Sequence, residues 1–360
     1  MPGILVTCPQ ERDRREAAAA GLAAVFAGPD LDVVASFDAE ALVTELAGLP
    51  ADGVAGTKDR SALVAALVAE RLGLPGPSPA TLVRCQHKPT ARAIAREVVS
   101  EATPRFGDVE PAFVKPAVGR LSQAYDEAYV RGWLDLARLA GFEGEVGLLA
   151  EEVLTGEEVT LEGYVHRGRV TTIGVTDSLM YPGTNSFERF EYPSRLSDER
   201  LDELDGVAER LLPALGFDGG FFNLEFFVPQ AGPAKVTEVN GRIASQFAPL
   251  YRAVHGRSSY DALFELARGR DPAWEAVPRD GVAVSYVLRA FEDALVGAVP
   301  EPEDGLEVLV RPGLRLSEQP GANDPASYRL AILVCAGETR EEAVTRCREQ
   351  ARALPFSLRR

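Results

Sequence analysis

Two apolar strands that carry carboxylates place the strongest limit on how this chain can fold. The segments FFNLEFFV and AKVTEVN are each typical of a β-strand, and PQAGP joins them as a turn. If the strands form an antiparallel hairpin centred on that turn, Glu225 faces Glu238 and Asn223 faces Asn240. Residues two apart point to the same side of a strand, so the four polar side chains are predicted to share one face.

This shared face predicts a metal site. Like charges directly opposed on a sheet are destabilising, so a cation is expected between Glu225 and Glu238. Two carboxylates and the amide oxygen of Asn240 are hard ligands that suit Mg²⁺, an ion that also binds substrate phosphates. The alternative is a surface hairpin whose glutamates point to solvent, but FFNLEFFV is too apolar for a solvated face.

The first ninety residues alternate short apolar runs with helical patterns, which indicates a parallel sheet in an α/β unit. The predicted strands are GILVTC, LDVVASF and DGVAG, and helices are predicted over REAAAAGLAAVFA, AEALVTELAGL and RSALVAALVAERLG. The first strand–helix turn has no GxGxxG, and the chain has no GxxxxGK[ST] loop. A dinucleotide site or a P-loop is therefore not expected.

Later segments change in pattern. The Pro-rich stretch LPGPSPATL marks a boundary, and one helix is predicted over roughly Thr81–Ser100. From Val146 the apolar residues alternate with period two, which predicts an antiparallel meander. The last eighty residues are typical of strands followed by a final helix, REEAVTRCREQARAL.

Composition excludes several classes of protein. The chain has 38 Lys and Arg against 54 Asp and Glu, a formal net charge of −16, so it is a poor candidate for non-specific binding of nucleic acid. No run of 18 apolar residues predicts a membrane helix, and the basic residues near the N-terminus follow the apolar run, the reverse of a secretory signal. The four cysteines form no CxxC and no Cys/His cluster. We therefore expect a reduced cytoplasmic protein without structural zinc.

Lysine is rare in this arginine-rich chain. It occurs only at Lys58, Lys88, Lys115 and Lys235, which is either chance or a sign that a compact point charge is needed there. Lys88 begins a predicted helix in RCQHKPTAR, and Lys115 lies in the strand FVKPAVG. Both positions suit a phosphate site, although a lone lysine is more often solvated.

A third acidic segment, LLAEEVLTGEEVTLEGYV, crowds glutamates around a Thr–Gly turn. The pattern fits a solvated hairpin end. It also fits a nucleotide hinge, in which backbone groups near Glu152–Leu154 bond adenine and a glutamate accepts from the ribose hydroxyls. By itself this signal does not separate the two interpretations.

Taken in order, the lysine of HKP, the FVKP strand, the EEVLTGEE hinge, the NLEF strand and the EVNGR segment resemble the ATP-grasp superfamily. Within it the chain is most similar to carboxylate–amine ligases, and its C-terminal lobe is similar to that of biotin carboxylase. The resemblance implies an ATP-grasp fold of mixed α/β and α+β class. Its parts are a Rossmann-like pre-ATP-grasp domain at 1–80, an ATP-grasp domain at 81–275 with a small lid at about 110–152, and an α+β lobe at 276–360.

The resemblance also implies roles for individual residues. The residues that match the ATP site are Lys88, Lys115, Glu151, Glu152, Val153, Leu154 and Glu158. The two lysines would contact phosphates, residues 151–154 would form the adenine hinge, and Glu158 would bind ribose. The residues that match the Mg²⁺ ligands, with Mn²⁺ as the substitute ion, are Glu225, Glu238 and Asn240. Arg242 matches an arginine near the γ-phosphate and the acyl-phosphate oxygens. The segment that follows it usually runs beside the acceptor pocket in relatives, which makes Ser245, Gln246, Tyr251 and Arg252 candidates there.

The implied reaction joins a small carboxylate to an amine through an acyl phosphate, with release of ADP and phosphate. No nucleic acid or membrane partner is implied, and a homodimer stays open because such relatives are often dimers. The alternatives are a bicarbonate-activating carboxylase, a ligase with a thiol or hydroxyl acceptor, and an ATP-binding protein without turnover. One departure concerns the loop AVGRLSQAYDEA, which is shorter and poorer in Gly and Ser than the usual phosphate-covering loop.

Overall fold

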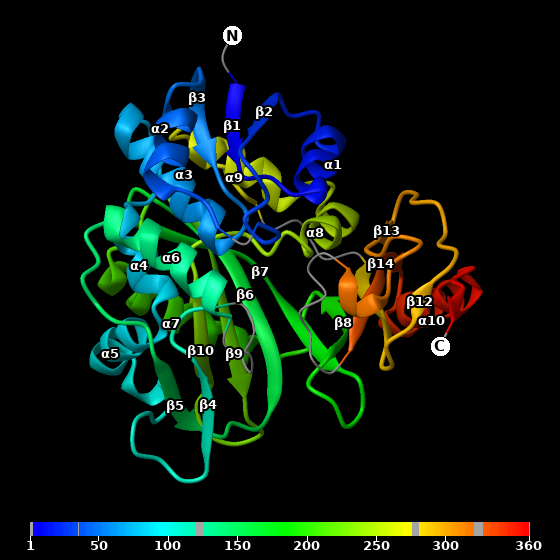
Figure 1. Cartoon of the computed structure of the whole chain (residues 1–360). Helices are drawn as coiled ribbons and strands as arrows, with labels where there is room; N and C mark the ends of the chain where they lie inside the picture. Colours follow the sequence, from blue (N-terminus) through cyan, green and yellow to red (C-terminus); the bar gives the residue numbers. More distant parts are fainter. Residues whose placement is uncertain (1–2, 35, 120–125, 276–280, 320–326, 360) are drawn as a thin grey trace. The chain divides into compact units, whose positions relative to one another are not determined.

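The computed structural model describes residues 3–34, 36–119, 126–275, 281–319 and 327–359 (Figure 1). The chain divides into two compact units. The first comprises Met1–Val175, Leu196–Ser245 and Ser259–Ala276, and the second comprises Thr176–Arg195, Gln246–Ser258 and Val277–Arg360. Among the described residues, no helix has both the length and the apolar character needed to cross a membrane. The domain boundaries inferred from the sequence stay a prediction.

A parallel three-stranded sheet begins the first unit, with the strand order β2-β1-β3. Its strands are β1 (Gly3–Thr7), β2 (Ala24–Ala27) and β3 (Ala51–Ala55), and the helices that alternate with them are α1 (Glu11–Ala19), α2 (Ala39–Ala47) and α3 (Asp59–Leu72). Helix α9 (Ser259–Ala267), far along the chain, also packs on β3 (Figure 1). The α/β unit predicted from the strand–helix alternation is confirmed.

Two predicted elements of this unit are wrong. The helix predicted over REAAAAGLAAVFA ends at Ala19, because Gly21 adopts a left-handed φ of 65° and the chain then forms β2. The predicted strand LDVVASF starts instead with a turn, in which the Asp30 carboxylate accepts a 2.9 Å hydrogen bond from the Asp32 backbone N–H. Local turn chemistry therefore overrides the apolar pattern at both places.

The helix predicted over roughly Thr81–Ser100 is two helices, α4 (Pro79–Gln86) and α5 (Lys88–Val98). His87 separates them with an extended ψ of 95°. Pro89 has no backbone N–H to continue the first helix, but it is well suited to the first turn of the second. Lys88 therefore begins a helix, as predicted.

An antiparallel sheet forms the rest of the first unit, in the order β10-β9-β6-β7. Its strands are β6 (Glu157–His166), β7 (Arg169–Met180), β9 (Gly220–Val228) and β10 (Lys235–Asn240), and β7 continues into the second unit. One face is apolar, with Val159, Leu161, Leu224, Phe226 and Val239 buried in the same core as α7 (Asp198–Leu215). The opposite face is polar, as the period-two pattern predicts. A separate pair, β4 (Ala112–Pro116) and β5 (Leu148–Glu152), is connected through α6 (Glu127–Leu139).

The second unit is built on antiparallel strands in the order β7-β8-β11-β14-β13. The strands not yet given are β8 (Phe187–Tyr192), β11 (Val282–Ala290), β13 (Leu306–Val308) and β14 (Tyr328–Gly337). Helix α10 (Arg340–Ala353) buries its apolar face against Val284 and Leu333, and α8 (Ala248–His255) also packs on β11 and β14. A short pair, β12 (Leu295–Val296) and β15 (Leu358–Arg359), completes it.

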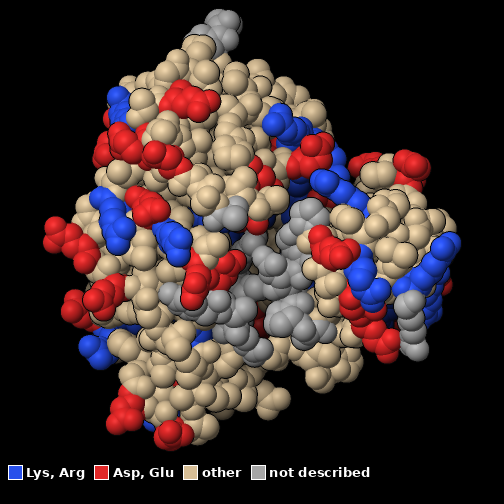
Figure 2. Space-filling model, in the orientation of Figure 1, with Lys and Arg blue, Asp and Glu red and all other residues tan. Residues whose placement is uncertain are grey.

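The cysteines depart from the prediction of four reduced thiols. Cys335 of β14 and Cys347 of α10 form a disulfide, with their Cα atoms 5.7 Å apart. The pairing arises because α10 folds back onto β14, which spacing alone does not reveal. Cys8 and Cys85 are free and buried. On the face shown in Figure 2, basic side chains are interspersed with acidic ones.

Candidate functional site

The β9–β10 hairpin has the predicted register. Glu225 pairs with Glu238, and Asn223 pairs with Asn240. Asn240 Nδ2 donates to Asn223 Oδ1 at 3.1 Å and lies 3.4 Å from Glu225 Oε1. These contacts confirm that the polar side chains share one face of the sheet.

Strand β6 extends this polar face. Thr160 pairs with Glu225, and Glu162 pairs with Asn223. Glu158 lies two residues before Thr160 and so points to the same side. Glu162 was not predicted, although its spacing from Glu158 was a signal. It is fully buried and accepts a 2.5 Å hydrogen bond from the Ala244 backbone N–H, which anchors the segment that follows β10.

We call Glu158, Glu225 and Glu238 the carboxylate cluster. Burial, reinforced by the charges of Glu238 and Glu158, raises the pKa of Glu225 to about 8. Burial and the charge of Glu238 raise the pKa of Glu158 to about 7. Lys88 Nζ lies 3.2 Å from Glu238 Oε1 and supplies one positive charge. The remaining repulsion is the electrostatic condition that a bound cation would relieve.

A bulge in β10 organises a second group of charges. The register with β9 shifts between Val236 and Glu238, and the carbonyl of Thr237 accepts hydrogen bonds from Arg92 and from Lys115 Nζ, the latter at 3.2 Å. Both cations also bind the Glu151 carboxylate, with Lys115 Nζ 2.7 Å from Oε2. Burial alone would raise the pKa of Glu151, but Arg92 and Lys115 hold it below its ordinary value.

Arg92 was missed by the sequence analysis, although it is only 1% exposed. It lies four residues after Lys88 on α5 and therefore on the same face of that helix. Asp59 was also missed, and no pattern in the sequence indicated it. Its Oδ1 atom accepts from Arg242 Nε at 2.6 Å, so the guanidinium that was predicted to face phosphate is held by a carboxylate. Burial opposes this charge, but Arg242 keeps the pKa of Asp59 below its usual value.

The hinge side chains after Glu151 lie outside this arrangement. Glu152 accepts from the backbone N–H of Arg105 at 2.8 Å and from its Nε at 2.9 Å. Val153 is 52% exposed, and Leu154 is half-buried. The adenine-binding role of this stretch stays a prediction.

A recess opens beside the carboxylate cluster. Its lining consists of Asp59, Cys85, Gln86, Lys88, Val118, Gly119, Tyr129, Trp133, Glu238, Val239 and Asn240. Lys88 Nζ donates to the Gly119 carbonyl at 3.0 Å, which ties the helix start to the end of the FVKP segment. The next residues of the predicted phosphate-covering loop, including Arg120 and Ser122, lie outside the described residues.

No three His, Cys, Asp or Glu residues converge on a single metal position within the described ranges. The predicted ligand set has two such residues and an amide, Asn240. It therefore depends on oxygen atoms from a ligand to complete a coordination shell, which is how Mg²⁺ is commonly held in phosphate sites.

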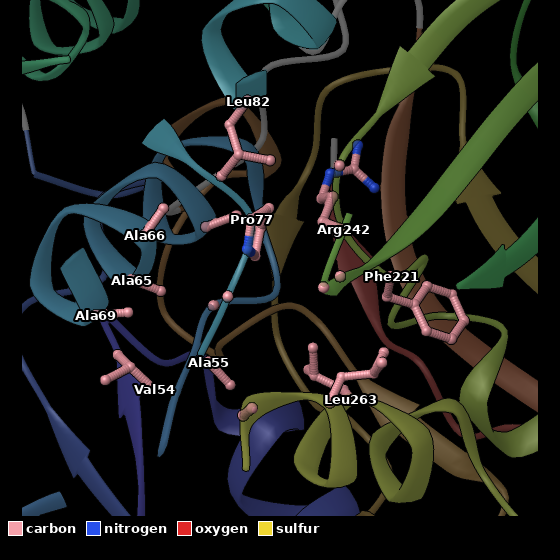
Figure 3. Close-up of a pocket in the computed structure, with 18 residues that line it drawn as sticks. Val54, Ala55, Ala65, Ala66, Ala69, Pro77, Leu82, Phe221, Arg242 and Leu263 are labelled. Atoms are coloured by element: carbon pink, nitrogen blue, oxygen red, sulfur yellow. The ribbon is translucent and has the colours of Figure 1, made fainter. Parts of the chain in front are cut away.

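We call residues 241–247, which follow β10, the post-β10 segment. A second, apolar recess lies where α3 and α9 meet the start of β9 and the start of the post-β10 segment (Figure 3). Arg242 lies across this recess from Val54 and Ala69 (Figure 3). Two glycines in its lining have no room for a side chain. A Cβ atom added to Gly56 would lie 2.2 Å from the Ser61 carbonyl oxygen, and one added to Gly241 would lie 2.3 Å from Leu82 Cδ2. Glycine at position 56 lets the β3–α3 turn fold closely onto the first turn of α3, and glycine at position 241 lets the post-β10 segment pack on α4.

Solved structures with this fold cover nearly the whole chain. L-amino acid ligase from Bacillus licheniformis is 19% identical with a TM-score of 0.79, covering 100% of this chain and 99% of its own. Phosphoribosylglycinamide synthetase from Anaerococcus prevotii is 13% identical with a TM-score of 0.72, covering 99% and 100%. Biotin carboxylase from Campylobacter jejuni, in complex with β-γ-ATP, is 14% identical with a TM-score of 0.69, covering 99% and 92%. The predicted ATP-grasp fold is thereby confirmed.

Sequence comparison reaches less far. No family model matches the chain. An uncharacterized protein of Sinorhizobium fredii, y4rH, is 28% identical over 206 residues. That match covers 51% of this chain and 41% of the relative, so the chain spans less than half of the relative's length.

Proposed function

We propose that this protein is an ATP-dependent carboxylate–amine ligase. The observation that carries the proposal is the pairing of Glu225 with Glu238 beside Asn240, on a face that also bears Glu158 and contacts Lys88. The carboxylates on this face repel one another unless a cation binds between them. A nucleoside triphosphate brings further negative charge, which the same cation would neutralise. The structural similarity to an L-amino acid ligase and to phosphoribosylglycinamide synthetase supports the same activity.

The donors on this face fit a divalent cation. Glu225, Glu238 and Asn240 would hold Mg²⁺, or Mn²⁺ in its place, through hard oxygen atoms. Burial and then the nearby carboxylates raise the pKa of Glu225, and a bound cation would offset the repulsion between these carboxylates. When bound, the ion would neutralise charge on the transferring phosphates.

The remaining predicted residues would bind and orient ATP. Lys88 and Lys115 would contact its phosphates, with Lys115 held in place by Glu151. The backbone of residues 152–154 would receive adenine, and Glu158 would bind ribose. Arg242, oriented by Asp59, would contact the γ-phosphate and the acyl-phosphate oxygens. Residues at about 110–152 would act as a lid that excludes water from the reactive intermediate.

In the proposed reaction, a carboxylate oxygen of the donor attacks the γ-phosphorus of ATP. The bond between that phosphorus and the β–γ bridging oxygen breaks, and ADP leaves with the electron pair. An amine then attacks the carbonyl carbon of the acyl phosphate, loses a proton and displaces phosphate. The partners are thus a small carboxylate and a small amine, and we place the reaction in the cytoplasm, where ATP is available.

The test is release of ADP from Mg²⁺-ATP in the presence of amino acids and small carboxylates, with hydroxylamine added to trap an acyl phosphate. We expect ADP and a hydroxamate that depend on one carboxylate and that are lost in Glu238→Gln. Glu157→Gln is the matched control, because Glu157 is exposed and adjacent to the cluster residue Glu158 but alternates to the other side of β6. It should retain the parent rate.

Other outcomes would replace the proposal. ADP release with bicarbonate alone would indicate a carboxylase, as in the biotin carboxylases of the same fold. Nucleotide binding without release by any acceptor would indicate an ATP-binding protein that does not turn over. If Mg²⁺-ATP does not bind, the ligase proposal is wrong.

A further inference from the structure

The parallel sheet of the first unit has a topological switch point, a place where the direction of winding reverses. From the central strand β1 the chain passes to β2 on one side and then to β3 on the other, so the direction of winding reverses between β1 and β3. In open α/β sheets, small ligands bind at this reversal, outside the carboxyl ends of the strands. The turns that border it here are the residues after Thr7 and after Ala55.

Lys58 lies beside this switch point, at the end of the β3–α3 turn. Its Nζ atom lies 3.1 Å from the hydroxyl oxygen of Ser245, which is itself 2% exposed. Ser245 follows Arg242 in the post-β10 segment, and Arg242 Nε contacts Asp59 Oδ1 at 2.6 Å, which holds that segment near the β3–α3 turn. The Lys58–Ser245 contact therefore lies close to the arginine that is proposed to face the γ-phosphate.

The partners of the four lysines differ in charge. Lys88 contacts Glu238 at 3.2 Å, and Lys115 contacts Glu151 at 2.7 Å. Lys235 bonds the backbone carbonyls of Glu101 and Thr103, at 2.8 and 3.3 Å. Lys58, by contrast, contacts the neutral hydroxyl of Ser245 at 3.1 Å.

Charges of both signs surround Lys58. Burial and the charges of Arg12 and Arg242 lower the pKa of Lys58 to about 8. Asp13 and Asp32 oppose this, but each accepts other hydrogen bonds: Asp13 from the backbone N–H of Gln10 at 2.7 Å, and Asp32 from Gln10 Nε2 at 3.2 Å. An anion placed against Lys58 would meet an ammonium and a buried hydroxyl that contact each other at 3.1 Å.

We infer that Lys58 and Ser245 bind the carboxylate of the donor substrate and hold it beside Arg242 for attack on ATP. This inference rests on the proposed ligase function. One carboxylate oxygen would accept from Lys58 Nζ and the Ser245 hydroxyl, which leaves the other free as the nucleophile. The ammonium would also reduce repulsion between the carboxylate and the γ-phosphate.

The experiment measures KM for the carboxylate that gives the most hydroxamate and, separately, KM for ATP. We expect Lys58→Met to raise the carboxylate KM at least about tenfold, the loss typical of one charge-assisted hydrogen bond, with the KM for ATP unchanged. Lys58→Arg should recover part of the loss, and Ser245→Ala should raise the carboxylate KM by roughly fivefold. Lys235→Met is the matched control and should equal the parent. An unchanged carboxylate KM in Lys58→Met, or an equal rise in the KM for ATP, would overturn the inference.

A binding measurement separates failure of this inference from failure of the ligase proposal. Thermal stability of the parent and of Lys58→Met is measured with Mg²⁺-ADP alone and then with the standard L-amino acids and small dicarboxylates added. Stabilisation of both proteins by Mg²⁺-ADP, with further stabilisation by a carboxylate in the parent only, supports the inference even without turnover. Equal stabilisation of both proteins by the carboxylate, or none in the parent, contradicts it. If Mg²⁺-ADP stabilises neither protein, the nucleotide site itself is wrong.

Discussion

Each unit has three carboxylates on strands of a β-sheet, but these carboxylates are paired with arginines in one unit and largely face one another in the other. In the first unit these are Glu158, Glu225 and Glu238, and in the second they are Asp177, Glu188 and Glu191. The carboxylates of the second unit meet arginines: Arg195 contacts Asp177 at 3.0 Å, Arg348 contacts Glu188 at 2.9 Å, and Arg189 and Arg340 contact Glu191 at 2.6 and 2.9 Å. In the first unit, Lys88 reaches one member of the cluster.

The difference appears in the titration of the carboxyls. Burial would raise the pKa of Glu191, but Arg189 and Arg340 hold it below the ordinary value. Glu225, which is half-buried, faces two more carboxylates, and burial together with these charges raises its pKa to about 8. A charge network that is satisfied by the chain stabilises the fold, whereas one that is left unbalanced is suited to binding a charged ligand. We therefore predict that mutations in the two networks have opposite effects on turnover and on stability.

The largest effect should come from Glu225→Gln. It removes a predicted cation ligand, so Mg²⁺-ATP turnover should fall by roughly 100-fold or more, a loss of the size seen when one stabilising group is removed from an active site. It also removes a repelling charge, so the melting temperature of the metal-free protein should stay the same or rise. The measurement is ADP release beside a thermal melt. A destabilised but active variant would show that the cluster is structural.

Glu191→Gln should show the reverse pattern. Its partners Arg189 and Arg340 would keep their charge with one carboxylate fewer, and breaking such a buried pair costs about 3–5 kcal/mol in the free energy of unfolding. Turnover per folded molecule should be nearly unchanged. Denaturant unfolding combined with active-site titration separates the two quantities. Loss of turnover at full stability would place the second network in the reaction.

The smallest effect is the pH dependence of stability in the metal-free protein. Because the folded-state pKa of Glu225 is raised from 4.5 to about 8, the folded state binds the extra proton between these values, and stability falls as pH rises through that range. The pKa of Glu191 is lowered, so its contribution is present above 4.5 and is lost as pH falls. Glu225→Gln should flatten the alkaline side of the profile, and Glu191→Gln the acidic side. Profiles that change on the opposite sides would contradict this assignment.

Much of the candidate site followed from local pattern. Period-two alternation was enough to place Glu225 opposite Glu238, because register in a hairpin is set by its turn and its apolar face. The break between α4 and α5 was missed because the apolar pattern continues through Pro89. Strand β2 was missed because a four-residue strand after an alanine-rich helix resembles more helix.

What the sequence by itself determined is the α/β character of the first ninety residues, the face of the hairpin that bears carboxylates, and the family resemblance that led to the fold. Only the tertiary structure decided which side chains of distant segments contact one another. Arg92 meets Glu151 across 59 positions, Asp59 meets Arg242 across 183, and Lys58 meets Ser245 across 187. Periodicity reports which side of an element is buried, but not which distant element covers it. That choice is made by packing of the whole chain, and here it separates a charge network that is satisfied from one left open for ligands.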